Sequence, residues 1–335
     1  MKRFEINEND AGQRLDKFVG KATSGMPSSL LYKYIRKKRI KVNGKRCDAS
    51  DRLNRGDVVE MYVPDEFFEK EAAPREYSRS TVPLDVVWED ENVLLVNKRP
   101  GVLSHTGDER GAAQSGEAER STLVFAVKSY LFDKGEYDPE RENSFAPALC
   151  NRIDRNTGGI VIAAKNAATL RAVNAAIKQR EIRKFYLCAV HGIPEKGEAT
   201  ETAYLIKDER TKRVSVFDSS RDGAKKIVTS FRVLKTDREA DLSLLEVELG
   251  PGRTHQIRAH LDHLGFPLVG EGKYGVNRED RKAGFRYQAL CSYKTVFESK
   301  SPELSYLFGR SFEIPTDPDH IPFLSLFERE EKDGR

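Results

Sequence analysis

The stretch from residue 151 to residue 165, NRIDRNTGGIVIAAK, constrains the fold more than any other part of this chain. Residues 160–164 form an apolar run that is too short to span a membrane and is rich in β-branched residues, so we expect a buried strand. Gly158 and Gly159 allow the backbone to bend tightly and to approach a neighbouring segment just before that strand. Asp154 therefore lies on a loop that leads into a sheet, where functional side chains tend to gather.

Asp154 stands between two arginines, Arg152 and Arg155. Their charges favour the ionised form of the carboxylate, which indicates a nucleophile or a base that acts on an anionic substrate. Short motifs have low specificity, and on local chemistry alone an Arg-x-Asp-Arg pattern is more often a surface ion-pair cluster than an active site. Both interpretations stay open at this point.

Positive charge is concentrated at the start of the chain. Residues 1–65 contain 15 Lys and Arg against 9 Asp and Glu, whereas the whole 335-residue chain has a net charge of only +4. This excess predicts a small anion-binding module. The length allows two domains, and residues 66–82 are charged and aperiodic. We therefore expect a basic domain over 1–65, a linker over 66–82 and a second domain over 83–335.

The remaining composition excludes several classes of protein. None of the cysteines stands at zinc-finger spacing or indicates a disulfide framework, which is typical of a reducing cytosol. The first residues lack the apolar core of a signal peptide, and no segment approaches the roughly 18 apolar residues of a membrane helix. We expect a cytoplasmic protein without a membrane partner. The cysteines are Cys47, Cys150, Cys188 and Cys291.

Residues 1–65 read as a compact α/β module. A short helix is expected to start at Leu15, and Ser28 and Ser29 can cap a second helix. An Asn-Gly pair within residues 40–45 predicts a hairpin, and residues 57–63 form a further strand. The apolar face of the second helix consists of Leu30, Leu31, Tyr34 and Ile35, and its basic residues are Lys33, Arg36 and Lys37.

A basic helix face is usually just solvated, but the basic hairpin beside it favours phosphate binding. The segment also resembles the small RNA-binding module first known in a ribosomal protein, the S4-like fold. The motifs that carry this resemblance are residues 14–18, RLDKF, the basic helix, residues 40–44, IKVNG, and residues 55–57, RGD.

Residues 83–249 alternate between predicted strands and helices. We expect strands over 86–88, 92–97, 185–190, 227–233 and 242–249, the last two forming a hairpin, and an aperiodic loop over 106–121. Thr122 and Asn166 stand at the starts of two predicted helices.

A second group of polar residues follows the last strand, in residues 250–261, GPGRTHQIRAHL. The Gly-Pro-Gly turn precedes Thr254, which can cap a helix that ends at Gly265. His255, Arg258 and Asp262 share one face of that helix, near an N-terminus that attracts anions.

The three histidines of this helix raise the question of a metal site, which we do not expect here. His255, His260 and His263 do not share one face, and no carboxylate or cysteine stands at ligand spacing. We expect structural roles for His260 and His263. Arg258, in contrast, faces inward and needs a carboxylate partner, and we expect that partner to be Asp154.

Together with residues 97–101, NKRPG, these two groups resemble the RluA-type pseudouridine synthases over about residues 83–320. The motifs are Arg152-Ile153-Asp154 with Thr157 and Gly159, and residues 252–258, GRTHQIR. An S4-like module in front is common in that family. Three positions depart from the family pattern, because Asn151 replaces a histidine, Ile153 a leucine and Gly158 a serine.

The resemblance implies an α+β pseudouridine synthase fold, with a mixed, largely antiparallel sheet flanked by helices. It implies isomerisation of uridine to pseudouridine in RNA, with ribosomal RNA of the large subunit as the expected substrate, no cofactor and no metal. Asp154 matches the nucleophile, Tyr186 the tyrosine that stacks on the base, and Arg258 the arginine that pairs with the carboxylate. Arg152 matches the residue that fills the gap left by the flipped nucleotide.

A non-catalytic ribosome-assembly factor on the same scaffold is the alternative, although the intact Asp154, Tyr186 and Arg258 argue against it. We expect a monomer. The residues expected to bind the RNA substrate are Arg152, Asn151, Thr157, Lys98, Arg253 and His255 near the catalytic carboxylate, and Lys33, Arg36 and Lys37 on the N-terminal module.

Overall fold

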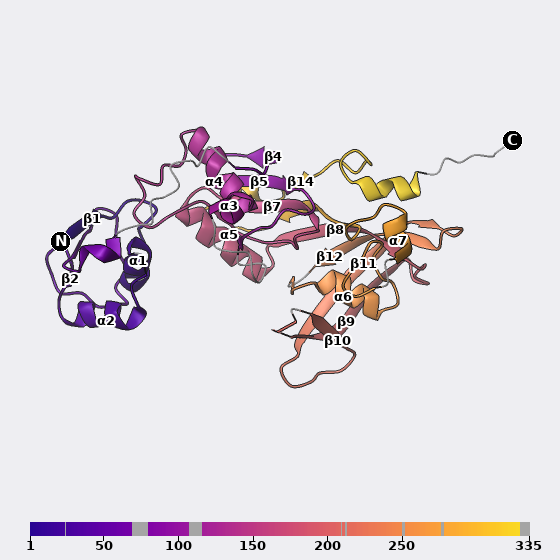
Figure 1. Ribbon diagram of the computed structural model, residues 1–335, viewed down its shortest axis with the longest axis horizontal. Helices are drawn as coiled ribbons and strands as arrows, with labels where there is room; N and C mark the ends of the chain where they lie inside the picture. The colour runs from indigo at the N-terminus through magenta and orange to yellow at the C-terminus, as the bar shows by residue number, and fades with distance from the viewer. Residues whose placement is uncertain are drawn as a thin grey trace.

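The computed structural model describes residues 1–23, 25–68, 80–106, 116–208, 210–211, 213–249, 252–275 and 278–328. Figure 1 shows a small N-terminal unit at one end of an elongated molecule and a large sheet with its helices at the other. Within the described residues, no helix has both the length and the apolar character needed to cross a membrane.

The N-terminal unit is a three-stranded antiparallel sheet in the order β1-β3-β2, packed against two helices. The predicted turn at Asn43-Gly44 is confirmed, since both residues adopt positive φ angles of 52° and 74°. It closes only a single bridge between Val42 and Lys45, because β2 takes β3 as its partner. The elements are β1 (Lys2–Glu5), α1 (Leu15–Ala22), α2 (Ser28–Arg36), β2 (Ile40–Val42), β3 (Val58–Met61) and the 3-10 helix η1 (Asp65–Phe68).

Two expectations for this unit need correction. Helix α2 begins at Ser28 with Pro27 as its N-cap and no side-chain capping bond, so the two serines do not cap it. Phe68, expected in the linker, is buried in the core of the N-terminal unit. Residues 69–79 of that predicted linker lie outside the described residues.

The large sheet has eleven strands and is mixed and largely antiparallel, as predicted. Among the strand pairs of the described chain, only β13 and β7 run parallel. The predicted hairpin of β11 and β12 is confirmed. In spatial order the strands are β10 (Val214–Phe217), β9 (Glu198–Lys207), β11 (Lys225–Asp237), β12 (Leu242–Leu249), β8 (Ile182–His191), β13 (Leu290–Phe297), β7 (Gly158–Ala164), β5 (Val93–Lys98) and β4 (Val86–Glu89), with β14 (Ser311–Glu313) beside β13 and β6 (Ala148–Leu149) beside β7.

Helices cover both faces of this sheet. Alternate residues of β5 and β7 enter two separate cores, one shared with α5 and the other with α4 and α6. The predicted helix starts are confirmed, since Thr122 and Asn166 cap α4 and α5 by accepting bonds from Phe125 N–H and Thr169 N–H. The helices are α3 (Gly116–Arg120), α4 (Leu123–Asp133), α5 (Ala167–Gln179), α6 (Gln256–His263) and α7 (Arg278–Lys282), with 3-10 helices η3 (Ser305–Leu307) and η4 (Pro322–Phe327).

The loop expected over 106–121 is partly helical, because α3 occupies its end, and residues 107–115 lie outside the described residues. The predicted close approach of the glycine pair is confirmed. Gly159 has a φ of 120°, and a Cβ placed there would lie 2.4 Å from the Ser292 carbonyl oxygen. Only glycine therefore fits where β7 pairs with β13.

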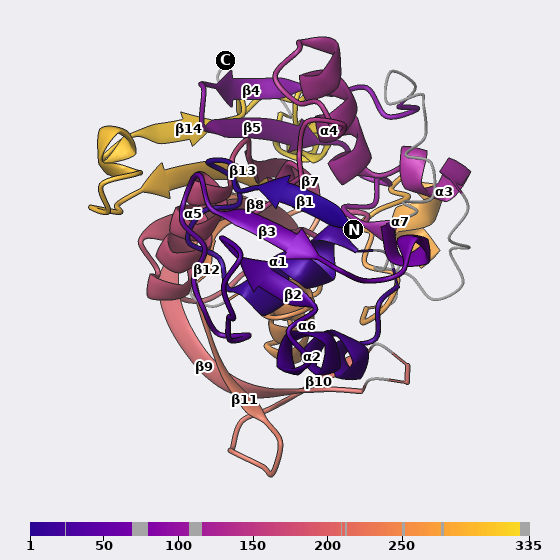
Figure 2. The ribbon, with the colours of Figure 1, turned by 90° about the vertical axis from the view of Figure 1, so that its left-hand side faces the viewer.

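Polar side chains join the two units. Figure 2 shows the N-terminal unit in front, with its small sheet facing the viewer. Asn9 donates to Glu142 at 2.6 Å and accepts from the Ala167 N–H at the start of α5. Asp10 is fully buried and accepts bonds from Asn143 and Ser144. A buried carboxylate with several donors fixes the orientation of its neighbours, so these contacts define how the units sit together.

Candidate active site

Asp154 lies on the loop that joins β6 to β7, and backbone contacts hold this loop in place. The buried Lys98 ammonium donates to the carbonyl oxygens of Arg99, Val102 and Arg155, at 3.1, 2.9 and 2.8 Å. Ile153 is buried in the core beside the loop. The carboxylate is thus presented by a fixed backbone, with its side chain 24% exposed.

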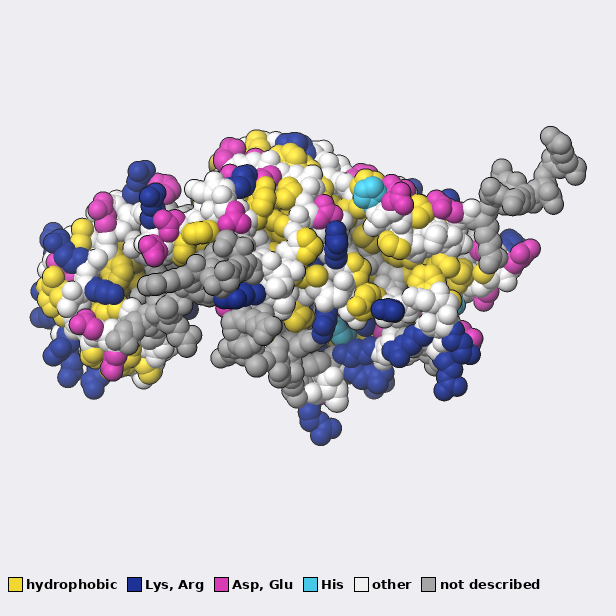
Figure 3. Space-filling view, turned by 45° about the horizontal axis from the view of Figure 1, so that its top comes forward, with side chains coloured by type: hydrophobic (Ala, Val, Ile, Leu, Met, Phe, Trp, Pro, Cys, Tyr) yellow, Lys and Arg dark blue, Asp and Glu magenta, His cyan; other side chains and the backbone are white. Residues whose placement is uncertain are grey.

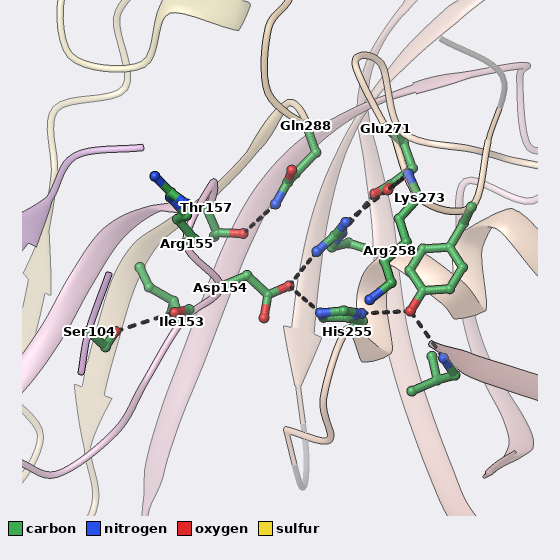
Figure 4. A network of polar contacts seen from close by, with 12 residues as sticks. Ser104, Ile153, Asp154, Arg155, Thr157, His255, Arg258, Glu271, Lys273 and Gln288 are labelled. Carbon is green, nitrogen blue, oxygen red and sulfur yellow. Dashed lines mark hydrogen bonds and ion pairs between the residues drawn. The ribbon is translucent and has the colours of Figure 1, made fainter. Parts of the chain in front are cut away.

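Arg258 reaches this carboxylate from helix α6, as predicted. Its Nη1 lies 2.8 Å from Asp154 Oδ2, between residues that are 104 positions apart in the chain. Figure 4 shows that the second oxygen of Asp154, Oδ1, points away from Arg258 and His255. One carboxylate oxygen is therefore held by a cation and the other faces away from that cation.

Helix α6 starts differently from the prediction. Its N-cap is His255 in a left-handed conformation with a φ of 53°, and Thr254 does not cap it. A left-handed non-glycine residue is strained and is over-represented at functional sites. Gly265 follows the helix with a φ of 88°, as expected for a C-terminal stop. The first part of the predicted Gly-Pro-Gly turn, residues 250–251, lies outside the described residues.

His255 lies between Asp154 and Tyr274. Its Nε2 is 3.9 Å from Asp154 Oδ2, and its Nδ1 is 2.6 Å from the Tyr274 hydroxyl. Burial lowers the pKa of His255 to about 4, against the opposing effect of the Asp154 charge. The imidazole is therefore neutral near pH 7, whereas Arg258 is a cation in direct contact with Asp154.

Asp154, His255 and Arg258 line a pocket that opens to solvent. Tyr186 of β8 lies in its wall, and burial raises the pKa of Tyr186 to about 12, so the ring is neutral near pH 7. The described residues that line it are Arg152, Ile153, Asp154, Thr157, Lys184, Tyr186, Leu249, Gly252, Arg253, His255, Gln256, Ile257, Arg258 and Leu290.

Some of the residues expected to bind the substrate do not line this pocket. Asn151 uses its Oδ1 to accept a bond from Ile162 N–H of β7, and Lys98 binds backbone carbonyls, so both support the loop. Three other expected residues, Lys33, Arg36 and Lys37, belong to the N-terminal unit and are exposed in the last turns and at the end of α2.

The three histidines of this region do not converge. His260 is fully buried and bonds Thr229, while His263 bonds the exposed Asp218. Both engage in side-chain contacts outside the pocket, in keeping with the structural roles expected for them.

A second carboxylate beside Arg258 was not among the residues predicted from the sequence. Glu271, only 1% exposed as a side chain, accepts from Arg258 Nε at 2.7 Å and from Nη2 at 2.8 Å. Lys273, which is labelled in Figure 4, and Tyr274 follow Glu271 on the same loop. Thr157 accepts a bond from Gln288. The available signal was the run GEGKYG over residues 270–275, where three glycines surround charged and aromatic side chains.

Comparisons with known proteins agree with this geometry. Residues 92–263 match the model of a family described as RNA pseudouridylate synthase, and residues 13–59 match the S4 domain. An uncharacterized RNA pseudouridine synthase of Mycoplasma capricolum is 32% identical over 96% of this chain and 99% of its own length. A ribosomal large subunit pseudouridine synthase C of Vibrio cholerae is 32% identical over 83% and 81%.

A solved structure extends the likeness to the fold. Human RNA pseudouridylate synthase domain containing 4 aligns with a TM-score of 0.54 and 17% identity, over 72% of this chain and 92% of that one. At this level of identity the likeness concerns the fold alone.

Proposed function

Because the chain belongs to the RNA pseudouridylate synthase family, an isomerase family that acts on RNA, we propose that it converts uridines of large-subunit ribosomal RNA into pseudouridine in the cytoplasm. Relatives named ribosomal large subunit pseudouridine synthase C support this choice of RNA. The contact of 2.8 Å between Asp154 and Arg258 at the wall of a pocket is the structural observation that carries the proposal.

Asp154 is the nucleophile in this proposal, and it attacks either the sugar or the base of the target uridine. The bond between N1 of uracil and C1′ of the ribose breaks, and the uracil rotates. A bond then forms between C5 and C1′, C5 loses its proton, and N1 gains one. Arg258 binds Oδ2 of this partly buried carboxylate at 2.8 Å, and the orientation of Oδ1 away from Arg258 supports attack by Oδ1.

Tyr186 and Arg152 have separate roles in flipping the target base. A base inside a stack cannot rotate, so the target nucleotide leaves the stack at a cost of a few kcal/mol. Tyr186, a neutral ring in the wall of the pocket, stacks on the extruded uracil. Arg152 is exposed at the mouth of the pocket, where its planar guanidinium can stack in the gap left in the RNA.

The sequence predicts a basic domain over 1–65, a linker over 66–82 and a catalytic domain over 83–335, and Phe68 extends the core of the first domain beyond residue 65. In this proposal the N-terminal unit has a separate function. Many Lys and Arg side chains lie on this unit, at the left of Figure 3. Lys33, Arg36 and Lys37 bind RNA phosphates in this proposal, while Thr157, Arg253 and His255 contact the target nucleotide. The enzyme acts as a monomer.

Tritium release tests the reaction, because isomerisation frees the hydrogen at C5 of uracil. We expect the wild-type chain to release tritium from ribosomal RNA labelled at that position and Asp154→Asn to release none. Asp218→Asn, at an aspartate whose side chain is 92% exposed and which lies outside the pocket, is the control and should keep full activity. A wild-type chain that binds this RNA and releases nothing contradicts the proposal and indicates an assembly factor instead.

A further inference from the structure

Arg258 divides its guanidinium between two carboxylates. Nε and Nη2 donate to the two oxygens of Glu271, and Nη1 donates to Asp154 Oδ2 at 2.8 Å. A guanidinium prefers to bind a carboxylate through two parallel bonds. Glu271 takes this two-bond arrangement, so Asp154 receives a single one.

The position of Glu271 does not depend on Arg258 alone. Its Oε1 accepts a bond from Lys273 N–H at 2.7 Å, and the neighbouring Gly270 N–H donates to Asp280 at 2.7 Å. Gly270 has a φ of 74°, and a Cβ there would lie 2.3 Å from the Tyr287 carbonyl oxygen. The loop therefore has a fixed path that brings a carboxylate to the far side of Arg258.

Glu271 is ionised in the folded protein. Burial acts to raise the pKa of Glu271, but the hydrogen bonds and the charge of Arg258 outweigh it and lower that pKa below its usual range. Glu271 is thus an ionised, almost fully buried group outside the lining of the pocket. It therefore makes no direct contact with a substrate bound in that pocket.

We propose that Glu271 is a positioning residue for the isomerisation. It occupies the fork of Arg258 that Nε and Nη2 form, and thereby restricts Arg258 to one oxygen of Asp154. Without Glu271, the freed fork can turn and bind both Asp154 oxygens. The oxygen that attacks the substrate would then be engaged by a cation. This inference rests on the proposed function, since it assigns Glu271 a part in the chemistry of Asp154.

Steady-state kinetics on a short uridine-containing RNA test this role. We expect Glu271→Gln to lower kcat about 100-fold, the scale for a misplaced catalytic group, while KM changes less than about twofold because Glu271 does not line the pocket. Glu271→Asp, which keeps the charge, should recover part of kcat. In an Arg258→Lys background, which removes the fork, Glu271→Gln should have little further effect on kcat.

Glu89→Gln is the matched control for a purely structural effect. Glu89 also binds cations, Lys134 and Lys165, with a side chain that is 14% exposed, and it lies outside the pocket. If Glu271→Gln and Glu89→Gln have equal kcat values per folded molecule, the role of Glu271 is overturned. An active wild type still supports the proposed function in that case. An inactive wild type refutes both. If Glu271→Gln does not fold, Glu271→Asp carries the test. The inference is then overturned if Glu271→Asp leaves kcat unchanged and its effect adds to that of Arg258→Lys in the double mutant.

Discussion

Replacing Arg258 with Met should destabilise the protein at neutral pH far more than replacing a comparable arginine elsewhere. Arg258 and Glu271 have side chains that are 10% and 1% exposed. Removing one partner of a buried ion pair costs about 3–5 kcal/mol, because the other charge stays buried without compensation. We expect a loss in this range in the free energy of unfolding at pH 7.

Arg183 provides the control. It binds Glu248 through the same two-bond arrangement, at 2.7 and 2.9 Å, but these side chains are 40% and 35% exposed. Solvent screens such a pair, which contributes about 0–1 kcal/mol. Arg183→Met therefore removes the same type of interaction and differs mainly in burial.

The dependence on pH follows from Glu271. In the wild type its pKa is lowered, so its contribution to stability is present above about pH 4.5 and is lost as the pH falls through the lowered value. In Arg258→Met, burial without the cation raises the pKa of Glu271. Stability then recovers as the pH falls, because protonation removes the uncompensated charge. The deficit of the variant should be largest at pH 7–8 and should shrink towards pH 4.5.

Urea denaturation followed by tryptophan fluorescence measures this deficit. The single tryptophan, Trp88, lies in β4 of the large sheet and packs on Phe312, with ring centroids 4.7 Å apart. A deficit below about 1 kcal/mol at pH 7, in the range of an exposed pair, would refute the reasoning. So would a deficit that stays constant from pH 8 to pH 5.

Four further predictions follow from the described contacts. Asn151→Ala should lower stability by about 1–3 kcal/mol, since it leaves the Ile162 N–H unpaired, and should leave kcat unchanged in the tritium assay; a raised KM with full stability would favour RNA contact instead. Because burial lowers the pKa of His255 to about 4, kcat should show no histidine limb between pH 5.5 and 8, and a limb near 6.5 that disappears in His255→Asn would be inconsistent. Replacing Lys33, Arg36 and Lys37 together by Gln should reduce the slope of log K against log salt by about 2, at about 0.7 per phosphate contact, with kcat on a short RNA unchanged; an unaltered slope would exclude phosphate contacts there. The pair Asn9→Ala and Glu142→Ala should release the N-terminal unit and increase the radius of gyration in small-angle scattering, whereas an unchanged radius would show that other contacts suffice.

The partner of Arg258 could be predicted because a buried arginine requires a carboxylate, and Asp154 was the one singled out by its neighbours. The second partner could not, because Glu271 stands in a glycine-rich run without the periodicity that places a side chain on a face. The two carboxylates lie 117 positions apart in the chain and meet only through the packing of α6.

Lys98 and Asn151 show a different limit of sequence reasoning. Both are polar residues beside the catalytic motifs, and substrate binding was the expected role. Their partners are backbone groups, at Arg155 of the loop and at Ile162 of β7. Every residue has such groups, so residue types give no indication of these contacts. The predicted cap at Thr254 failed for a related reason, since the bond from His255 to Tyr274, a tertiary contact, accompanies the left-handed start of α6.

The balance of charge in the site explains why its rim is basic. Asp154 and Glu271 bring two negative charges to the single positive charge of Arg258, and an RNA substrate adds phosphates to the same place. Like charges at short range in a partly buried site oppose binding. Arg152 and Arg253 line the mouth of the pocket, and Lys273 lies beside the carboxylates (Figure 4). These cations offset the excess negative charge, so the Asp154 carboxylate and an anionic RNA can occupy one pocket.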